Sequence, residues 1–201
     1  MEALKFKSKI LLASLLSLLF TTSSFTITGC VPAAFVAGAS VGLVVYDQRK
    51  PSTIAIDKNI ALAAQSKLKA DKELYSQSHV TVAVFNGVML LVGQTPTEEL
   101  RERAEQLVRQ YSGIKLLYNE IAIAEPVSNG VRGHDAWITA KVKSTLIATH
   151  GLNSASLKVV TENGVVYLMG MTTKRQGELA ASKAQRISGV TKVVKLFEYV
   201  T

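Results

Sequence analysis

An internal repeat constrains the fold of this chain more than any other feature. Residues 80–93 and 157–170 each contain an Asn-Gly pair, followed six residues after its glycine by a further glycine. Upstream, Asp57 corresponds to Asp135, and downstream the Ser-Gly pair at 112–113 corresponds to the one at 188–189. The offset between the copies is 76 to 78 residues. A single repeat of this length indicates two similarly folded modules in tandem.

Each copy is expected to run helix, strand, strand, helix, strand. The Asn-Gly pair lies between two runs rich in β-branched residues, and this predicts a hairpin because glycine allows the positive φ of a type I′ turn. In the second copy Ile138, Val142 and Leu146 recur every four residues, which is typical of one helix face. Asp57 and Asp135 are interpreted as N-caps of the first helices. In the first copy, Thr95 or Thr97 would cap the second helix.

The last strand of each copy, at residues 115–123 and 191–200, follows a helix and should run parallel to the strand before that helix. The predicted fold class is therefore α+β, with two tandem αββαβ modules that each form a mixed three-stranded sheet with two helices. The modules are assigned to residues 55–124 and 134–201. Residues 125–133, which contain Pro126 and two glycines, are interpreted as the linker.

Residues 1–29 have the pattern of a secretory signal. Three lysines precede an uncharged apolar run at residues 10–20, which is too short to remain as a membrane-spanning helix. The mature chain would then begin at Cys30, and residues 30–54 are interpreted as a flexible tether. Gly38 and Gly42 have the spacing of a helix-packing motif, but a linker is the favoured interpretation.

Cys30 is the only cysteine in the chain, so it cannot form an internal disulfide. Residues 27–30, Ile-Thr-Gly-Cys, resemble the lipobox of bacterial lipoproteins. That resemblance implies a covalent diacylglycerol and an N-acyl chain on Cys30, with no other cofactor. It also implies an anchor in the outer membrane that faces the periplasm, because Val31 stands where an Asp would signal retention in the inner membrane. The alternative is a buried cysteine near an ordinary cleavage site.

The two copies differ in charge. Residues 57–124 carry eight basic and eight acidic side chains, whereas residues 132–201 carry ten basic and four acidic ones, a net charge of +6. Basic side chains near an anionic bilayer contribute about 1 kcal/mol each. The second module is therefore the one expected to bind an anionic membrane. The neutral first module suits packing against the second module or against an envelope protein partner.

Trp137, the only tryptophan, is the centre of the candidate site. On a helical wheel it lies about 130° from the apolar stripe, and Asn59 occupies its position in the first copy. Lys141 follows one turn later, and a loop at residues 132–134 would bring backbone near a phosphate. The predicted phospholipid-binding residues are Arg132, His134, Trp137 and Lys141. The alternative is that Trp137 covers the seam between the modules.

The duplicated αββαβ pattern, with its Asn-Gly hairpins and the Gly-Val or Gly-Ile pair before the last strand, resembles the BON domain. Two such copies behind a lipobox resemble the dual-BON outer-membrane lipoproteins of Gram-negative bacteria. The resemblance implies phospholipid binding, support of outer-membrane integrity and no catalytic activity, with anionic phospholipid bound by the second module.

Other classes of function fit less well. The three histidines, His79, His134 and His150, do not have metal-ligand spacing, so neither a metal site nor catalytic residues are expected. The export signal argues against nucleic acid as a partner, and aromatic residues do not alternate with the basic ones as stacking platforms would. The remaining alternative is an envelope protein-interaction or scaffold module that touches lipid only through its acyl anchor. Salt distinguishes lipid binding from this alternative, because lipid binding through charge weakens as the salt concentration rises, whereas an apolar protein interface does not weaken in this way.

Overall fold

The computed structural model describes residues 47–200. The predicted signal peptide, Cys30 and most of the predicted tether lie outside these residues. The helices are α2 (Pro51–Ala70), α3 (Lys72–Gln77), α4 (Glu98–Arg109), α5 (Asn129–Ile147) and α6 (Lys174–Gln185), with a 3-10 turn, η2 (Ser154–Ser156). The strands are β1 (His79–Phe85), β2 (Val88–Thr95), β3 (Leu116–Ile123), β4 (Leu157–Glu162), β5 (Val165–Thr172) and β6 (Lys192–Tyr199). No helix of the described part of the chain is both long and apolar enough to cross a bilayer.

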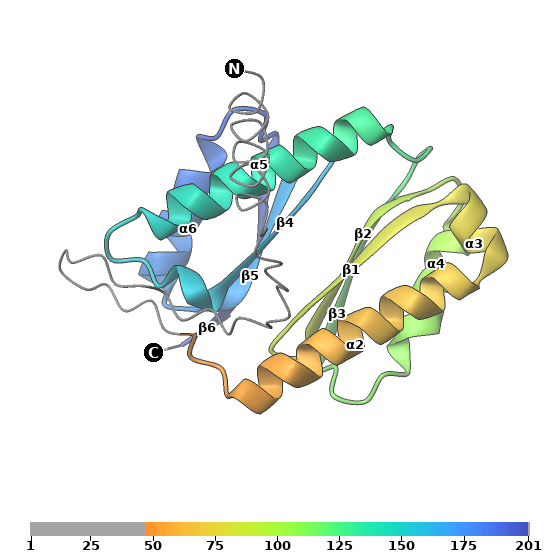
Figure 1. The fold of residues 1–201 in the computed structure, drawn as a ribbon, viewed down its shortest axis with the longest axis horizontal. Helices are drawn as coiled ribbons and strands as arrows, with labels where there is room; N and C mark the ends of the chain where they lie inside the picture. Colours follow the sequence, from red (N-terminus) through yellow and green to blue (C-terminus); the bar gives the residue numbers. More distant parts are fainter. Residues whose placement is uncertain (1–46, 201) are drawn as a thin grey trace, which may run out of the picture. The chain divides into compact units, whose positions relative to one another are not determined.

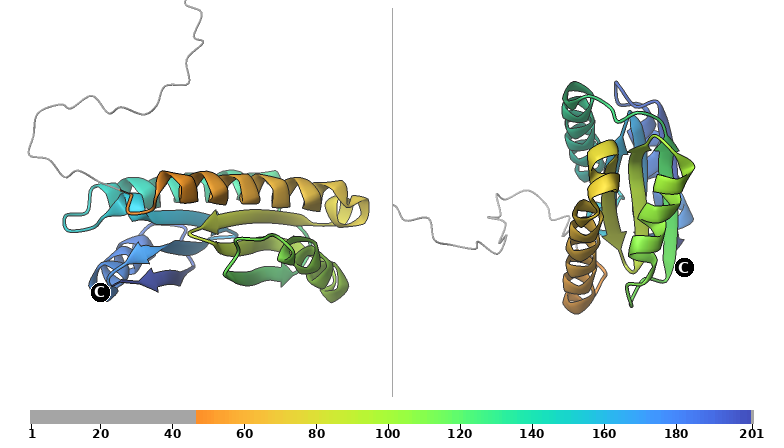
Figure 2. Two further views of the ribbon diagram at one scale, coloured as in Figure 1. Left: turned by 90° about the horizontal axis from the view of Figure 1, so that it is seen from below. Right: turned by 90° about the vertical axis from the view of Figure 1, so that its right-hand side faces the viewer.

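Both modules have the predicted topology (Figure 1). β1 pairs antiparallel with β2, which pairs parallel with β3, and β4, β5 and β6 repeat this arrangement. The first helix of each module packs along the outer strand of its hairpin, as α2 does on β1 in Figure 2. The first module adds the short helix α3, where the second has η2. The α+β prediction of two mixed three-stranded sheets is confirmed.

The hairpins turn where the sequence predicts. Asn86 and Gly87 have φ values of 50° and 75°, and Asn163 and Gly164 have 48° and 75°. Two consecutive positive φ values are the geometry of a type I′ turn, which matches the twist of the flanking strands. The second helices also begin as their sequence indicates, since the Thr97 and Thr173 hydroxyls accept hydrogen bonds from Leu100 N–H and Gln176 N–H.

The prediction that Asp57 and Asp135 are N-caps is wrong. α2 begins six residues before Asp57, after Lys50, and α5 begins after Ser128, whose hydroxyl caps it. Asp57 and Asp135 lie buried in the second turn of these helices, and their carboxylates accept backbone hydrogen bonds from the two turn residues of their own hairpin. The early start of α5 also places residues 129–133, predicted as linker, in a helix.

Each module has its own core between its helices and one face of its sheet. In the second module the predicted stripe of Ile138, Val142 and Leu146 is fully buried there. The first core is built around Ala64, Leu91 and Ala104, among other residues. Because side chains alternate along a strand, each sheet has a second face that these cores leave uncovered.

The second faces of the two sheets pack against each other. A shared apolar cluster contains Phe85, Leu90 and Val92 of the first module with Tyr167, Met169 and Leu196 of the second. Gln94 Nε2 donates to the buried Glu162 carboxylate at 2.9 Å, and Lys158 Nζ donates to Val84 O at 3.3 Å. Burial raises the pKa of Glu162 and lowers that of Lys158. The neutral first module therefore packs on the second, one of the two roles expected for it.

Arg49 fixes the residues that precede α2. Its guanidinium donates to Asp47 and to Asp57 at 2.8 Å, and it lies over the Phe85 ring, 3.7 Å from the centroid. Phe85 belongs to the cluster between the sheets. Residues in the stretch predicted as tether, Asp47 and Arg49, therefore contact one another and the first module.

Candidate functional site

The outward side of α5 is uncharged and carries two large apolar side chains. Trp137 is 45% exposed and Ile147 is 63% exposed. Ten residues of helix separate their Cα atoms by about 15 Å along the axis. The other exposed residues on this side are small: Ala140 and Ser144 lie between the two, and Ala136 precedes Trp137. We call these five residues the α5 face.

His134 and Lys141 flank Trp137 along one edge of the α5 face. The imidazole stacks on the indole with a centroid distance of 5.5 Å and an interplanar angle of 19°. Lys141 Nζ lies 5.3 Å from the indole centroid, within the range of a cation–π contact. The helix places them there because residues three before and four after Trp137 are its neighbours on the helix surface. Three of the four predicted site residues are thus in contact.

Gly189 positions His134. A Cβ atom at Gly189 would lie 2.6 Å from His134 Nε2 and 2.9 Å from the Ile138 side chain, and Gly189 has a φ of 89°. The glycine of the repeated Ser-Gly pair therefore leaves room for the imidazole. The first module has the same glycine, Gly113, beside Ile56, the counterpart of His134.

Arg132 does not join the other three residues. Its Nε and Nη2 both donate to Val127 O, at 3.2 and 3.0 Å. It lies five residues before Trp137, about 140° around the helix, so its side chain is directed elsewhere. The predicted loop at residues 132–134 is also wrong, because these residues belong to α5, so the backbone approach to a phosphate expected at this loop is not available.

Ile147 and Lys143 were missed from the sequence. Both are exposed, and Lys143 lies about 120° from Trp137, on the other edge of the α5 face. The helical wheel that separates Trp137 from the buried stripe also separates Ile147 from it. The helical spacing alone therefore places Ile147, like Trp137, on the outward side.

The corresponding side of α2 lacks an aromatic residue. Asn59, at the position of Trp137, is exposed, as predicted from the repeat. Ile56 and Leu62 are 52% and 58% exposed, so α2 also presents apolar side chains. The difference is that α2 has neither the stacked indole nor a lysine above it.

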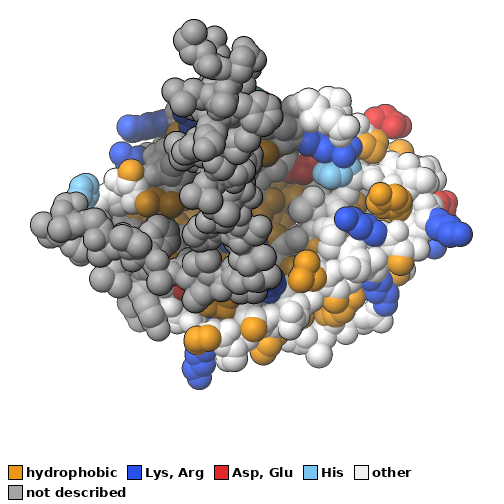
Figure 3. Space-filling view, viewed as in Figure 1, with side chains coloured by type: hydrophobic (Ala, Val, Ile, Leu, Met, Phe, Trp, Pro, Cys, Tyr) orange, Lys and Arg blue, Asp and Glu red, His pale blue; other side chains and the backbone are white. Residues whose placement is uncertain are grey.

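Basic side chains are spread out over the visible part of the face drawn in Figure 3. In Figure 3 the visible Lys and Arg side chains stand apart, with uncharged and hydrophobic side chains between them. Within residues 47–200, His, Cys, Asp and Glu side chains form no cluster that could hold a metal ion. Burial and nearby Arg132 lower the pKa of His79, which lies in the first module, away from the α5 face.

Comparison with known proteins gives matches to one domain family. Residues 56–125 and 134–201 each match the BON domain. The outer membrane lipoprotein DolP of Haemophilus influenzae is 32% identical over 172 residues, covering 86% of this chain and 89% of that protein. A 21 kDa hemolysin of Actinobacillus pleuropneumoniae is 35% identical, covering 77% and 79%. The osmotically-inducible protein Y of Escherichia coli is 26% identical, covering 65% and 68%.

Proposed function

This chain belongs to the BON domain family and carries two copies of the domain, and we propose that it is a non-enzymatic lipoprotein of the outer membrane. In this proposal the acyl chains on Cys30 anchor it, and α5 of the second module binds anionic phospholipid. Through both contacts the protein supports the integrity of the envelope.

Two observations support the anchor and its place. Cys30 ends a lipobox-like sequence directly after a secretory signal. A relative that aligns with 86% of this chain is named an outer membrane lipoprotein. Two acyl chains hold a protein on a membrane stably, whereas one chain alone gives only marginal binding.

The observation that carries lipid binding is the exposed Trp137 between His134 and Lys141. A tryptophan left 45% exposed on a helix is well suited to the membrane interface, where its ring meets acyl chains and its N–H meets headgroups. Its stacking on His134 and the cation–π contact with Lys141 limit the rotamers of the indole. Less rotamer entropy would then be lost on binding.

The rest of the α5 face suits a helix that lies in the plane of the interface. Small side chains between Trp137 and Ile147 allow the helix to approach the bilayer closely, and Lys141 and Lys143 flank the face on opposite edges. Each lysine would contribute about 1 kcal/mol near an anionic surface. Apolar insertion supplies affinity, and the lysines supply the preference for anionic lipid.

Vesicle flotation tests this proposal. The soluble fragment Leu43–Thr201, which is one compact unit, retains Arg49 and all of α2 but lacks Cys30. We expect it to float with phosphatidylglycerol vesicles and not with phosphatidylcholine vesicles, less strongly as salt rises. Trp137→Glu should abolish flotation. Asn59→Glu places the same charge at the equivalent position of the first module and should leave flotation unchanged.

A second candidate function is a scaffold that binds an envelope protein and meets lipid only through Cys30. An exposed tryptophan is also typical of protein interfaces. Failure of the wild-type fragment to float would refute lipid binding by α5 and favour this alternative. If Trp137→Glu and Asn59→Glu reduced flotation equally, the loss would be an effect of the added charge and not of the position of Trp137.

A further inference from the structure

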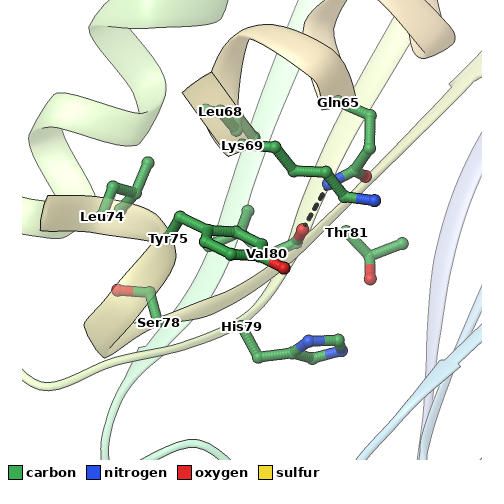
Figure 4. A pocket seen from close by; sticks show the side chains of 9 residues that line it. All are labelled: Gln65, Leu68, Lys69, Leu74, Tyr75, Ser78, His79, Val80 and Thr81. Carbon is green, nitrogen blue, oxygen red and sulfur yellow. Dashed lines mark hydrogen bonds between the residues drawn. The ribbon is translucent and has the colours of Figure 1, made fainter. Parts of the chain in front are cut away.

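We propose that the first module binds an extended peptide through a pocket at the edge of β1. The pocket would accept an apolar side chain of the peptide, and this side chain would lie next to a carboxylate of the same peptide. The pocket lies between the end of α2, helix α3 and the start of β1 (Figure 4). Its volume is about 310 Å³, at the lower end of the range for ligand sites and sufficient for one large side chain. This site is separate from the α5 face.

The lining of the pocket is apolar below and basic at the rim. Leu68, Leu74 and Val80 contribute apolar surface, and the Tyr75 ring also lines the pocket (Figure 4). Tyr75 is 63% exposed, so much of its ring remains free to stack on a ligand. Lys69 is the one lysine or arginine that lines the pocket, and no Asp or Glu lines it. The chemistry therefore favours an apolar group with a negative charge beside it.

The polar groups of the edge strand indicate a peptide and not a small molecule. Gln65 Nε2 donates to Val80 O at 2.8 Å, and Gln65 Oε1 accepts from Val82 N–H at 3.0 Å. These two backbone groups are the ones that an added strand would use. The Gln65 amide thus occupies the place of one peptide unit, and a flexible side chain can be displaced by an incoming backbone.

Ser78 leaves a further polar group unused. Its hydroxyl is buried in the pocket wall and has no hydrogen-bond partner among the described residues. A buried donor without a partner is costly. A change of rotamer would offer this hydroxyl to a bound peptide.

The second module has a smaller pocket at the same place in the repeat. It measures about 140 Å³ and is lined by Leu146, Ile147 and Leu157, among others, with Lys143 at the position of Gln65. A hollow between the first helix and the edge strand is therefore a property of this fold. Only the first module combines the larger volume with an exposed aromatic wall and a peptide-like amide.

Titration of the fragment Leu43–Thr201 with short peptides, followed by backbone amide NMR shifts, tests the proposal. The probe alternates Thr and Val and ends in Phe with a free carboxylate. We expect shifts at residues 78–82 and saturable binding. Capping the carboxylate as an amide should weaken binding roughly three- to fivefold, as expected for an exposed ion pair. N-acetyl-phenylalanine should bind much more weakly than the peptide, and equal affinity would overturn the assignment to an extended peptide.

Variants then locate the site. Lys69→Gln should weaken binding as much as the amide cap does, and Tyr75→Ala should weaken it about tenfold. Lys72→Gln removes a nearby exposed lysine that does not line the pocket and should change nothing. Gln65→Ala should tighten peptide binding because it frees the backbone groups Val80 O and Val82 N–H. Unchanged affinity would refute pairing of the peptide with the edge of β1.

Peptide binding by the first module does not depend on lipid binding by α5. The Trp137→Glu variant should bind the peptide as the wild type does, so failure of vesicle flotation and failure of peptide binding are separate outcomes. Peptide-induced shifts confined to the second module would overturn the proposal.

Discussion

Asp135 Oδ1 accepts a hydrogen bond from Gly164 N–H at 2.8 Å, which ties α5 to the turn of the β4–β5 hairpin. Asp135 Oδ2 accepts from Asn163 N–H at the same distance. Asp57 makes the same pair of bonds to Asn86 and Gly87 in the first module. An αββαβ module thus joins its first helix to its hairpin through one buried carboxylate.

Removing this carboxylate should destabilise the protein strongly. Asp135→Ala leaves two backbone N–H groups near the turn without an acceptor, so we expect the free energy of unfolding to fall by about 2–4 kcal/mol. Asp135→Asn keeps one acceptor oxygen and should lose less. Urea denaturation measures both. The comparison variant Asp71→Ala removes the cap of α3 and an exposed ion pair with Arg103. It should lose about 1 kcal/mol for the cap, and little more for the ion pair. Similar losses for the Asp135 and Asp71 alanine variants would contradict this role.

Glu162 should make stability depend on pH. Burial raises its pKa above the ordinary value of 4.5, with Asp135 adding to the rise and Gln94 and Arg132 opposing it. The folded state therefore binds the proton more tightly than the unfolded state, and stability from this group is lost as pH rises through the folded-state pKa. Glu162→Gln should gain stability relative to wild type above that range. Urea denaturation from pH 4 to pH 8 checks this, and a difference that does not vary with pH would contradict it.

Gly189 should be required for the position of His134. Gly189→Ala introduces both a strained positive φ and a clash with the imidazole, whereas Gly151→Ala, with a φ of 75° and no atom within 4 Å of the added Cβ, introduces the strain alone. We expect the first variant to lose more stability, since strain by itself costs about 1 kcal/mol. It should also change the near-ultraviolet circular dichroism of Trp137. Equal effects of the two variants would show that the contact with His134 is unimportant.

Ile147 should share membrane insertion with Trp137. Ile147→Glu should reduce flotation with phosphatidylglycerol vesicles and reduce the blue shift of the fluorescence of Trp137, which is the only tryptophan and so reports on its own site. Leu116→Glu is the matched control, since Leu116 is 47% exposed on β3. A normal blue shift in Ile147→Glu would restrict the contact to the Trp137 end of α5.

Much of the fold followed from local pattern. The hairpins, the buried stripe of α5 and the exposure of Trp137 were predicted because turn geometry and helical period depend on neighbouring residues. The starts of α2 and α5 were misplaced for the same reason. Asp57 and Asp135 resemble caps in sequence, but their partners lie about 30 residues away in the hairpin, and only the folded chain brings these groups together.

The sequence by itself determined the duplicated αββαβ modules, the charge of the second module and the outward position of Trp137, because each depends on composition or on a short repeating spacing. The tertiary structure decided the rest. It directed Arg132 to Val127 O, packed the two sheets against each other around Phe85 and Tyr167, and left a pocket beside Gln65. These features depend on contacts between segments far apart in the chain, and such contacts exist only once the helices and sheets have packed.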